Sequence, residues 1–292
     1  MAWRLGLLGH PLGHSLSPAI HEAALAACGL TGEYVLYEVD APALADAVER
    51  LRRGERDGLN VTIPHKVAVV HAVDGLAGAA AALGAVNTLV RDGGRVVGHN
   101  TDVGGLVRAV REAFSLGDLR GEPVAIVGAG GAARAAALAA AQLGAGVVRI
   151  ANRTPDRARD LVLALVGAGL RVELAPDFVA AARGAALLLQ ASSLGLGLAA
   201  TAAAWATAML TIEPVIAALA PDAKVFDLVY RPEVTPWCAA AHASGRRAAS
   251  GLGMLVHQAA DAFTLWTGHT PPRAPLLAAA QAALARSATV LP

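Results

Sequence analysis

Short apolar runs alternate along most of the chain with longer stretches in which apolar residues recur every three or four positions. The short runs predict buried strands, and the longer stretches predict helices that face a core. In the first third, strands are predicted near Leu5–Leu8, Tyr34–Glu38 and Leu59–Val61, with helices near Pro18–Cys28 and Ala43–Arg52. This alternation is typical of an α/β fold with a mostly parallel sheet.

Residues typical of helix ends and turns sharpen this pattern. Ser17 is expected at the N-cap of the first helix, Pro18 at its first position and Gly29 directly after its end. Two short strands, around Thr88–Arg91 and Arg95–Gly98, flank an Asp-Gly-Gly sequence and predict a hairpin.

The strand pattern starts again after a polar linker, G-D-L-R-G-E-P, that follows a helix expected between Asp102 and Phe114. The later strands are predicted around residues 124–127, 147–151, 171–174, 186–189 and 225–228. Two helices are expected to close the chain, one from Gly251 and one over Pro275–Arg286. A chain of 292 residues suits two domains better than one core.

Composition excludes several classes of partner. The net charge of +1 offers no electrostatic reason to expect nucleic acid or an acidic membrane surface. Two cysteines, Cys28 and Cys238, occur without a Cys-x-x-Cys or Cys/His cluster and predict neither a disulfide framework nor a metal site. A small molecule is therefore the expected partner.

The high mean hydropathy of +0.50 makes membrane-spanning segments worth checking. The stretch from Gly184 to Ile212 has no charged residue, but polar residues and glycines interrupt it, which favours a strand, a loop and a helix over one spanning helix. The N-terminal residues reach His10 and Pro11 too early for a secretory signal. A cytoplasmic protein is expected, either as a monomer or as a homodimer.

A glycine-rich loop directly follows the strand predicted at 124–127 and opens an alanine-rich helix. The loop consists of Gly128, Ala129, Gly130, Gly131, Ala132 and Ala133. In a Rossmann loop, the first glycine permits a tight turn, the second lets the backbone approach a pyrophosphate, and a small third residue lets helix and strand pack closely. The free N–H groups at the helix start then bind phosphate. The strand, loop and helix together predict a dinucleotide site.

The end of the next strand indicates which dinucleotide binds. Enzymes that use NAD usually place Asp or Glu there to accept hydrogen bonds from the ribose hydroxyls. Here the strand is followed by Asn152, Arg153 and Thr154, with Arg157 one turn further on. A guanidinium suits a 2′-phosphate, and Asp156 is placed to complement a helix dipole, so NADP is predicted.

Oxidation of a secondary alcohol by a dinucleotide needs a group that takes the hydroxyl proton as hydride leaves, and a lysine held by a carboxylate can do this without a metal. Lys66, which ends G-L-N-V-T-I-P-H-K, and Asp102, which ends G-H-N-T-D, are the candidates. Short polar residues that could line a site for a polyhydroxylated substrate are Asn60, Thr62, Asn87, Asn100 and Thr101. Each also has a simpler interpretation when taken singly: Lys66 as a solvated charge, Asn87 as a turn residue and Thr101 as an N-cap.

Taken together, these motifs resemble those of the shikimate dehydrogenase family over nearly the whole chain. The matches are G-x-P-x-x-H-S-x-S-P at Gly9–Pro18, N-V-T-x-P-x-K at Asn60–Lys66, G-A-x-N-T at Gly84–Thr88, G-x-N-T-D at Gly98–Asp102, N-R-T at Asn152–Thr154, D-x-x-Y-x-P-x-x-T-P at Asp227–Pro236 and G-x-x-M-L-x-x-Q at Gly251–Gln258. The resemblance implies a substrate-binding domain of residues 1–104 and 252–292, to which the C-terminal helices return. It also implies an NADP-binding, doubly wound Rossmann domain of residues 105–251.

The resemblance further implies an oxidoreductase activity: reversible NADPH-dependent reduction of 3-dehydroshikimate to shikimate, in aromatic amino-acid biosynthesis. Lys66 and Asp102 would form the catalytic pair. The implied substrate-binding residues are Ser15, Ser17, Thr62, Asn87, Tyr230 and Gln258. Beyond the glycine-rich loop and the arginine-bearing strand end, the implied cofactor-binding residues are Ser192, Gly251 and Met254.

The chain departs from the family pattern at one loop. Where the family has N-A-T-S-x-G-M, this sequence reads Q-A-S-S-L-G-L from Gln190 to Leu196, so contacts on the nicotinamide side are expected to differ in detail. Ser192 and Ser193 keep the loop polar. A quinate or aminoshikimate dehydrogenase that uses NAD or both cofactors is the close alternative, and a catalytically silent NADP-binding regulator is the alternative from another class.

Overall fold

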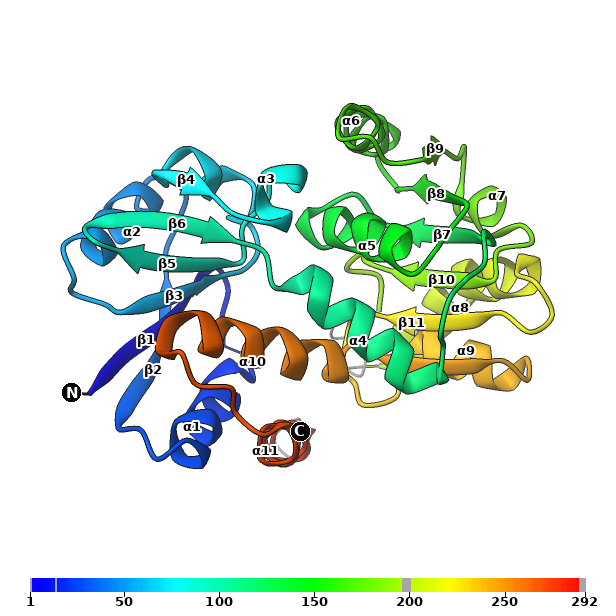
Figure 1. The fold of residues 1–292 in the computed structure, drawn as a ribbon. Coiled ribbons are helices and arrows are strands. Elements are labelled where there is room, and N and C mark those ends of the chain that lie inside the picture. The colour runs from blue at the N-terminus through cyan, green and yellow to red at the C-terminus, as the bar shows by residue number, and fades with distance from the viewer. Residues whose placement is uncertain (1, 14, 196–200, 289–292) are drawn as a thin grey trace. The chain divides into compact units, whose positions relative to one another are not determined.

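The computed structural model describes residues 2–13, 15–195 and 201–288. The chain forms two compact units, Met1–Gly105 with Leu255–Val290, and Leu106–Met254. It passes between them within two helices, α4 (Asp102–Phe114) and α10 (Leu252–Thr267). Each unit is built on its own six-stranded sheet, which confirms the α/β fold class (Figure 1).

The sheet of the first unit is mixed and has the order β2-β1-β3-β5-β6-β4. Its strands are β1 (Trp3–Gly9), β2 (Gly32–Glu38), β3 (Gly58–Val61), β4 (Gly75–Leu76), β5 (Thr88–Asp92) and β6 (Arg95–His99). Strand β1 is parallel to β2 and β3, whereas β5 is antiparallel to β3 and β6. The carboxyl ends of β1, β3 and β6 therefore share one edge with the amino end of β5.

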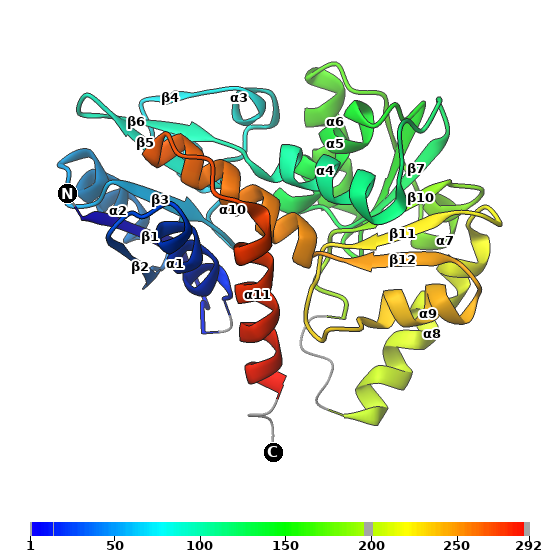
Figure 2. The ribbon, with the colours of Figure 1, turned by 60° about the horizontal axis from the view of Figure 1, so that its bottom comes forward.

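Helices cover both faces of this sheet. They are α1 (Ser17–Ala27), α2 (Leu44–Arg52), the short 3₁₀ helix η1 (Ala68–His71), α3 (Ala79–Leu83), α10 and α11 (Arg273–Ala288). Helix α2 packs Val48 and Leu51 against the face that carries Leu59. On the opposite face, Trp266 of α10 lies where a side chain on Gly58 would otherwise stand. Helix α11 lies against α1, so the C-terminal helices return to the first unit as expected (Figure 2).

The sheet of the second unit is wholly parallel, in the order β12-β11-β10-β7-β8-β9. Its strands are β7 (Pro123–Val127), β8 (Val147–Ala151), β9 (Val172–Leu174), β10 (Leu187–Gln190), β11 (Lys224–Asp227) and β12 (Arg247–Ser250). The helices that follow them are α5 (Gly131–Gln142), α6 (Pro155–Gly167), α7 (Phe178–Ala182), α8 (Ala202–Ala218) and α9 (Pro236–Ala243). This strand order is that of a doubly wound Rossmann sheet, in which the first strand lies beside the topological switch point.

Most predicted elements are present, but the prediction lacks strands β4 and β12 and several short helices, and one helix cap differs from expectation. Strand β4 is too short to give a pattern. Strand β12 has the sequence Arg-Ala-Ala-Ser, which does not predict a strand, and it forms one by pairing with β11. The prediction of Ser17 as an N-cap is wrong. Helix α1 begins at Ser17, and the Ser17 N–H donates to the Ser15 hydroxyl (3.2 Å). Among the described residues, none of the helices is long and apolar enough to cross a bilayer.

Candidate active site

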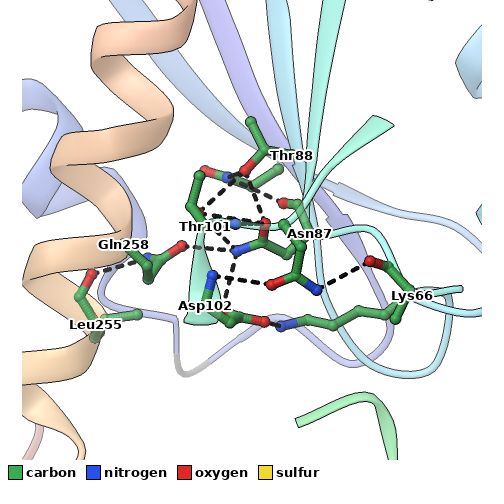
Figure 3. Close-up of polar contacts among 10 residues, drawn as sticks. Lys66, Asn87, Thr88, Thr101, Asp102, Leu255 and Gln258 are labelled. Atoms are coloured by element: carbon green, nitrogen blue, oxygen red, sulfur yellow. Dashed lines mark hydrogen bonds and ion pairs between the residues drawn. The ribbon is translucent and has the colours of Figure 1, made fainter. Parts of the chain in front are cut away.

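Lys66 and Asp102 form an ion pair at one edge of the first unit's sheet (Figure 3). The distance from Lys66 Nζ to Asp102 Oδ2 is 2.6 Å, and the two side chains are 16% and 5% exposed. Lys66 lies in the loop after β3, and Asp102 is the first residue of α4. The interpretation of Lys66 as a solvated charge is therefore wrong, because its ammonium group is largely buried and held by a carboxylate.

The loop that carries Lys66 is anchored along its length. The Thr62 N–H donates to Leu8 O (2.8 Å), which extends the pairing of β3 with β1, and the Lys66 carbonyl accepts from Val86 N–H (2.8 Å). His65 is buried, with Nε2 2.7 Å from Val39 O. Sequence reasoning missed His65 because the motif leaves its position open, and no other signal distinguishes it.

Asn87 is the centre of the hydrogen bonds around Asp102 (Figure 3). Its Nδ2 atom lies 2.9 Å from Asp102 Oδ1, 2.9 Å from Thr101 Oγ1 and 3.2 Å from Gln258 Oε1. The Thr101 N–H donates to Asn87 Oδ1 (2.8 Å), which sets the orientation of the amide. Because two amide hydrogens face three acceptors, the cluster retains acceptor capacity for a ligand hydroxyl.

Gln258 reaches this cluster from α10, far along the chain. Gly105 of α4 has no side chain, and a Cβ there would stand 2.9 Å from Gln258 Cβ. This close approach brings the amide oxygen of Gln258 to Asn87, while its Nε2 donates to Leu255 O (2.8 Å). Asn100 supports the turn before α4, because its Oδ1 accepts from Asp102 N–H (3.1 Å).

The other predicted substrate residues of the first unit follow β1 and β3, in loops or at the start of a helix. Ser15 is half-buried in the loop after β1, and Ser17 is buried at the start of α1. Thr62 directly follows β3, and its methyl group packs so closely on Gly9 that a Cβ there would come within 2.5 Å. His14, which belongs to the same motif as the serines, lies outside the described residues.

The glycine-rich loop in the second unit has the backbone geometry of a phosphate-binding turn. Gly128 has φ +125°, and a Cβ there would stand 2.6 Å from Ala191 O. Gly130 is the N-cap of α5, and a Cβ on it would meet nothing within 4 Å. Ala133 is fully buried. The loop therefore fits a pyrophosphate, since its backbone is open where the N–H groups of α5 begin, at Gly131 and Ala132.

Two guanidinium groups lie beyond the end of β8. Arg153 and Arg157 are exposed and make no hydrogen bond or ion pair with any residue that the structure describes. Asn152 donates to Thr154 O (3.0 Å), and Asp156 pairs with Arg159 (2.5 Å). The nearby carboxylate is thus engaged elsewhere, and the arginines are available for an anionic group.

Gln190, where the chain departs from the family pattern, organises the loop after β10. Its buried Nε2 donates to Ser192 O (3.2 Å) and Leu194 O (2.9 Å), and its Oε1 accepts from Ser192 N–H (2.5 Å). The Ser192 hydroxyl accepts from Leu194 N–H (3.1 Å), and Ser193 is exposed. Leu196, the last residue of the predicted departure, lies outside the described residues.

The remaining predicted residues of the second unit lie near the ends of β11 and β12. Tyr230 is half-buried in the loop after β11. Gly251 follows β12, its N–H donates to Val229 O (3.1 Å), and a Cβ on it would clash with Leu228 O at 2.1 Å. Met254 is 8% exposed. Only a glycine at 251 therefore allows the loop that carries Tyr230 to lie where it does.

In each unit, burial shifts the pKa of a titratable group to which the sequence analysis assigned no role. In the first unit, both ring nitrogens of His21 lack a partner among the described residues, and burial lowers its pKa to about 3. In the second, Asp227 accepts Val229 N–H on Oδ1 (3.0 Å), and burial raises its pKa to about 7. No group of three or more metal-ligating side chains occurs within the described parts of the chain.

Comparison with known proteins extends these observations to the whole chain. Residues 7–89 match the family model "Shikimate dehydrogenase substrate binding domain", and residues 251–281 match "Shikimate 5'-dehydrogenase C-terminal domain". A shikimate dehydrogenase (NADP(+)) from Moorella thermoacetica is 41% identical over 273 residues, which cover 92% of this chain and 89% of the relative.

Solved structures give the same result. The chain resembles shikimate 5-dehydrogenase from Thermus thermophilus in complex with NADP(H) and shikimate, with a TM-score of 0.80, 35% identity and coverage of 97% of this chain and 100% of the other. It also resembles 5-ketofructose reductase of Gluconobacter, with a TM-score of 0.80, 29% identity and coverage of 97% and 99%. The extent of these matches shows that the chain belongs to the shikimate dehydrogenase family.

Proposed function

We propose that this chain catalyses the reversible, NADPH-dependent reduction of 3-dehydroshikimate to shikimate. The single observation that carries the proposal is the buried ion pair of Lys66 and Asp102, with a separation of 2.6 Å, beside the amides of Asn87 and Gln258. This arrangement supplies a proton donor and hydrogen-bonding groups for a hydroxylated ring. The relative from Moorella thermoacetica is named for this activity.

Bound NADPH would supply the hydride that reduces the carbonyl carbon of the substrate. The Lys66 ammonium donates a proton to the carbonyl oxygen, so that the carbonyl becomes a secondary alcohol. Asp102 holds the ammonium in place and balances its charge. In the reverse direction, the same lysine receives the hydroxyl proton.

The other predicted site residues of the first unit take binding roles in this proposal. Ser15 and Ser17 would hold the substrate carboxylate, because their hydroxyls lie at the start of α1, where helix N–H groups favour an anion. Thr62, Asn87 and Gln258 would bind the ring hydroxyls. Tyr230 keeps its predicted role in binding the substrate. The first and second units would act as the substrate and cofactor domains.

The second unit would hold NADP through two kinds of contact. Backbone N–H groups of the loop from Gly128 to Ala132 would bind the pyrophosphate. Asn152, Thr154 and the two exposed guanidinium groups, Arg153 and Arg157, would bind the 2′-phosphate. Ser192, Gly251 and Met254 would line the nicotinamide side.

A matrix of substrates and cofactors tests the proposal. Initial rates would be measured from the absorbance of reduced nicotinamide with shikimate and quinate, each with NADP+ and NAD+, and with 5-ketofructose in the reducing direction. We expect the highest kcat/KM with shikimate and NADP+. A higher value with quinate or 5-ketofructose would show that shikimate is not the preferred substrate, and no change in reduced nicotinamide with any pair would favour a silent regulator.

The oligomeric state and the compartment stay predictions. We propose a monomer or a homodimer, which sedimentation equilibrium distinguishes directly. A cytoplasmic location would be checked by fractionating cells that produce the protein.

A further inference from the structure

We propose that a buried chain of hydrogen bonds, Tyr34–Asn60–Thr88, positions Asn87 and through it the carboxylate of Asp102. This inference rests on the proposed function, because it assigns positioning roles for the same reaction to three residues that need not touch the substrate. All of its members lie in the first unit and are almost fully buried. The chain of hydrogen bonds ends at Asp102 Oδ1, the oxygen that does not face Lys66.

Tyr34 determines which groups donate and which accept along the chain of hydrogen bonds. Its ring stacks on His21 with a centroid distance of 4.2 Å and an interplanar angle of 5°, so the phenol has little freedom to move. The Tyr34 hydroxyl donates to Asn60 Oδ1 (2.8 Å). This contact leaves Asn60 Nδ2 to donate to Asn87 O (3.1 Å) and Thr88 Oγ1 (3.1 Å). A flipped Asn60 amide would instead place its oxygen against the Asn87 carbonyl, which is repulsive.

The Thr88 hydroxyl links Asn60 to Asn87 and fixes the orientation of the Asn87 amide. The hydroxyl has a single hydrogen and accepts from Asn60, so that hydrogen is available for Asn87 Oδ1 at 3.0 Å. With Oδ1 turned toward Thr88, the Nδ2 group of Asn87 turns toward Asp102 (2.9 Å). Each donor in the chain is thus oriented by the one before it, and the last one meets a carboxylate, which is the strongest acceptor.

A second hydrogen bond to Asn87 limits how much the chain of hydrogen bonds contributes to its position. The Thr101 N–H also donates to Asn87 Oδ1 (2.8 Å), and this backbone contact does not depend on Thr88. Loss of the Thr88 hydroxyl would therefore loosen the Asn87 amide without letting it flip. The expected effect is a partial loss of rate rather than its abolition.

Two substitutions that remove only a hydroxyl test the chain. Thr88→Val keeps the shape of the side chain, and we expect kcat to fall about tenfold while KM changes less than about threefold. Thr88→Ser should restore the rate, because it restores the hydroxyl. Tyr34→Phe keeps the stack on His21 and acts further along the chain from Asp102, so we expect a smaller fall, about threefold.

Matched controls separate positioning from general loss of packing. Thr264→Val removes a hydroxyl that donates to Ala260 O of its own helix (2.8 Å). Tyr37→Phe removes a phenol oxygen on β2 that has no partner among the described residues. Both controls should keep kcat within about twofold of the wild type. If folded Thr88→Val or Tyr34→Phe also did so, the positioning role would be overturned.

A spectroscopic readout tests the chain without depending on activity. The side-chain NH₂ signals of Asn87 in a ¹⁵N–¹H spectrum should shift in Thr88→Val and Tyr34→Phe, and stay in place in the two controls. Unshifted signals in a folded Thr88→Val or Tyr34→Phe variant would reject the chain, even if the wild type proved inactive on shikimate. If the wild type were inactive on shikimate but the Asn87 signals shifted in the two variants, the proposed substrate would be wrong and the hydrogen-bond chain would still be supported.

Discussion

The two units are both six-stranded α/β structures, but they prepare their sites in different ways. In the first unit, the polar side chains at the sheet edge are already bonded to one another, with Lys66, Asn87 and Asp102 in one buried network. In the second, the glycine loop offers bare backbone, and Arg153 and Arg157 are exposed. A side-chain network suits groups that must be held in position for chemistry, whereas open backbone and exposed charges suit a large anionic ligand.

The buried titratable groups extend this contrast. His21 of the first unit loses affinity for protons on burial, and Asp227 of the second gains it. The free energy of unfolding contributed by each group therefore depends on pH with opposite sign. Substitutions in each unit can test this contrast. The largest effect is expected when Lys66, the proposed proton donor, is replaced.

Lys66→Ala should lower kcat by about 1000-fold, since it removes the proposed proton donor from the first unit. The KM for shikimate should change far less, because the proposed hydroxyl ligands remain. Steady-state kinetics at saturating NADP+ would measure both constants. Lys224→Ala is the control, as Lys224 lies in the second unit and its ammonium contacts Asp222 O (3.4 Å). Near-normal turnover by Lys66→Ala would refute the assignment.

Asp227 should make the second unit less stable as pH rises. Its pKa is about 7 in the folded protein and near 3.8 in the unfolded chain, so between these values only the unfolded state is ionised. From about pH 5 to pH 8 the free energy of unfolding should fall by about 2.5 kcal/mol through this group. Urea titrations should show a flatter dependence in Asp227→Asn, and an unchanged one in the exposed control Asp222→Asn. An unchanged dependence in Asp227→Asn would contradict this account.

His21 should make the first unit less stable as pH falls. Below its ordinary pKa of 6.5 the unfolded chain takes up a proton, whereas the buried ring, with a pKa of about 3, does not. The free energy of unfolding should therefore fall by about 2 kcal/mol between roughly pH 7.5 and pH 5, as urea titrations would measure. In His21→Phe, which keeps an aromatic ring on Tyr34, this part of the dependence should disappear. His71→Phe changes an exposed histidine and should leave it in place.

Arg153→Ala should raise the KM for NADPH about tenfold and leave the KM for NADH unchanged, because one charge-assisted hydrogen bond to a 2′-phosphate would be lost. The measurement is the ratio of the KM for NADPH to the KM for NADH. Arg159→Ala is the matched control, since Arg159 also lies near the start of α6 but pairs with Asp156. Equal effects of Arg153→Ala on both cofactors would remove the arginine from the 2′-phosphate site.

Most elements of both units follow from local patterns in the sequence. Strand β8 agrees with its prediction at both ends, and Gly29 follows α1 at φ +66° as expected. Gly93 and Gly94 adopt the positive φ that the predicted hairpin turn needs. These features involve residues close together in the chain, so apolar periodicity and turn chemistry are sufficient to predict them.

The first unit's site is only half accessible to sequence reasoning. Its motifs point to Lys66 and Asp102, but neither residue's own context separates it from an ordinary surface charge. Thr88 and Tyr34 look like ordinary strand residues, because a buried polar strand residue leaves no mark on the apolar pattern. The second unit's loop is easier to predict, since a phosphate turn needs glycines at fixed spacing and is built from one continuous segment.

Apolar periodicity and turn chemistry account for what could be predicted from the sequence alone: most strands and helices, the parallel Rossmann sheet and the dinucleotide turn. The meeting of distant side chains required the folded chain. Asn87 and Gln258 are 171 residues apart, and Lys66 and Asp102 are 36 apart. The burial of His21 and Asp227, which shifts their pKa values, likewise depends on tertiary structure, because the whole fold determines what packs around a residue.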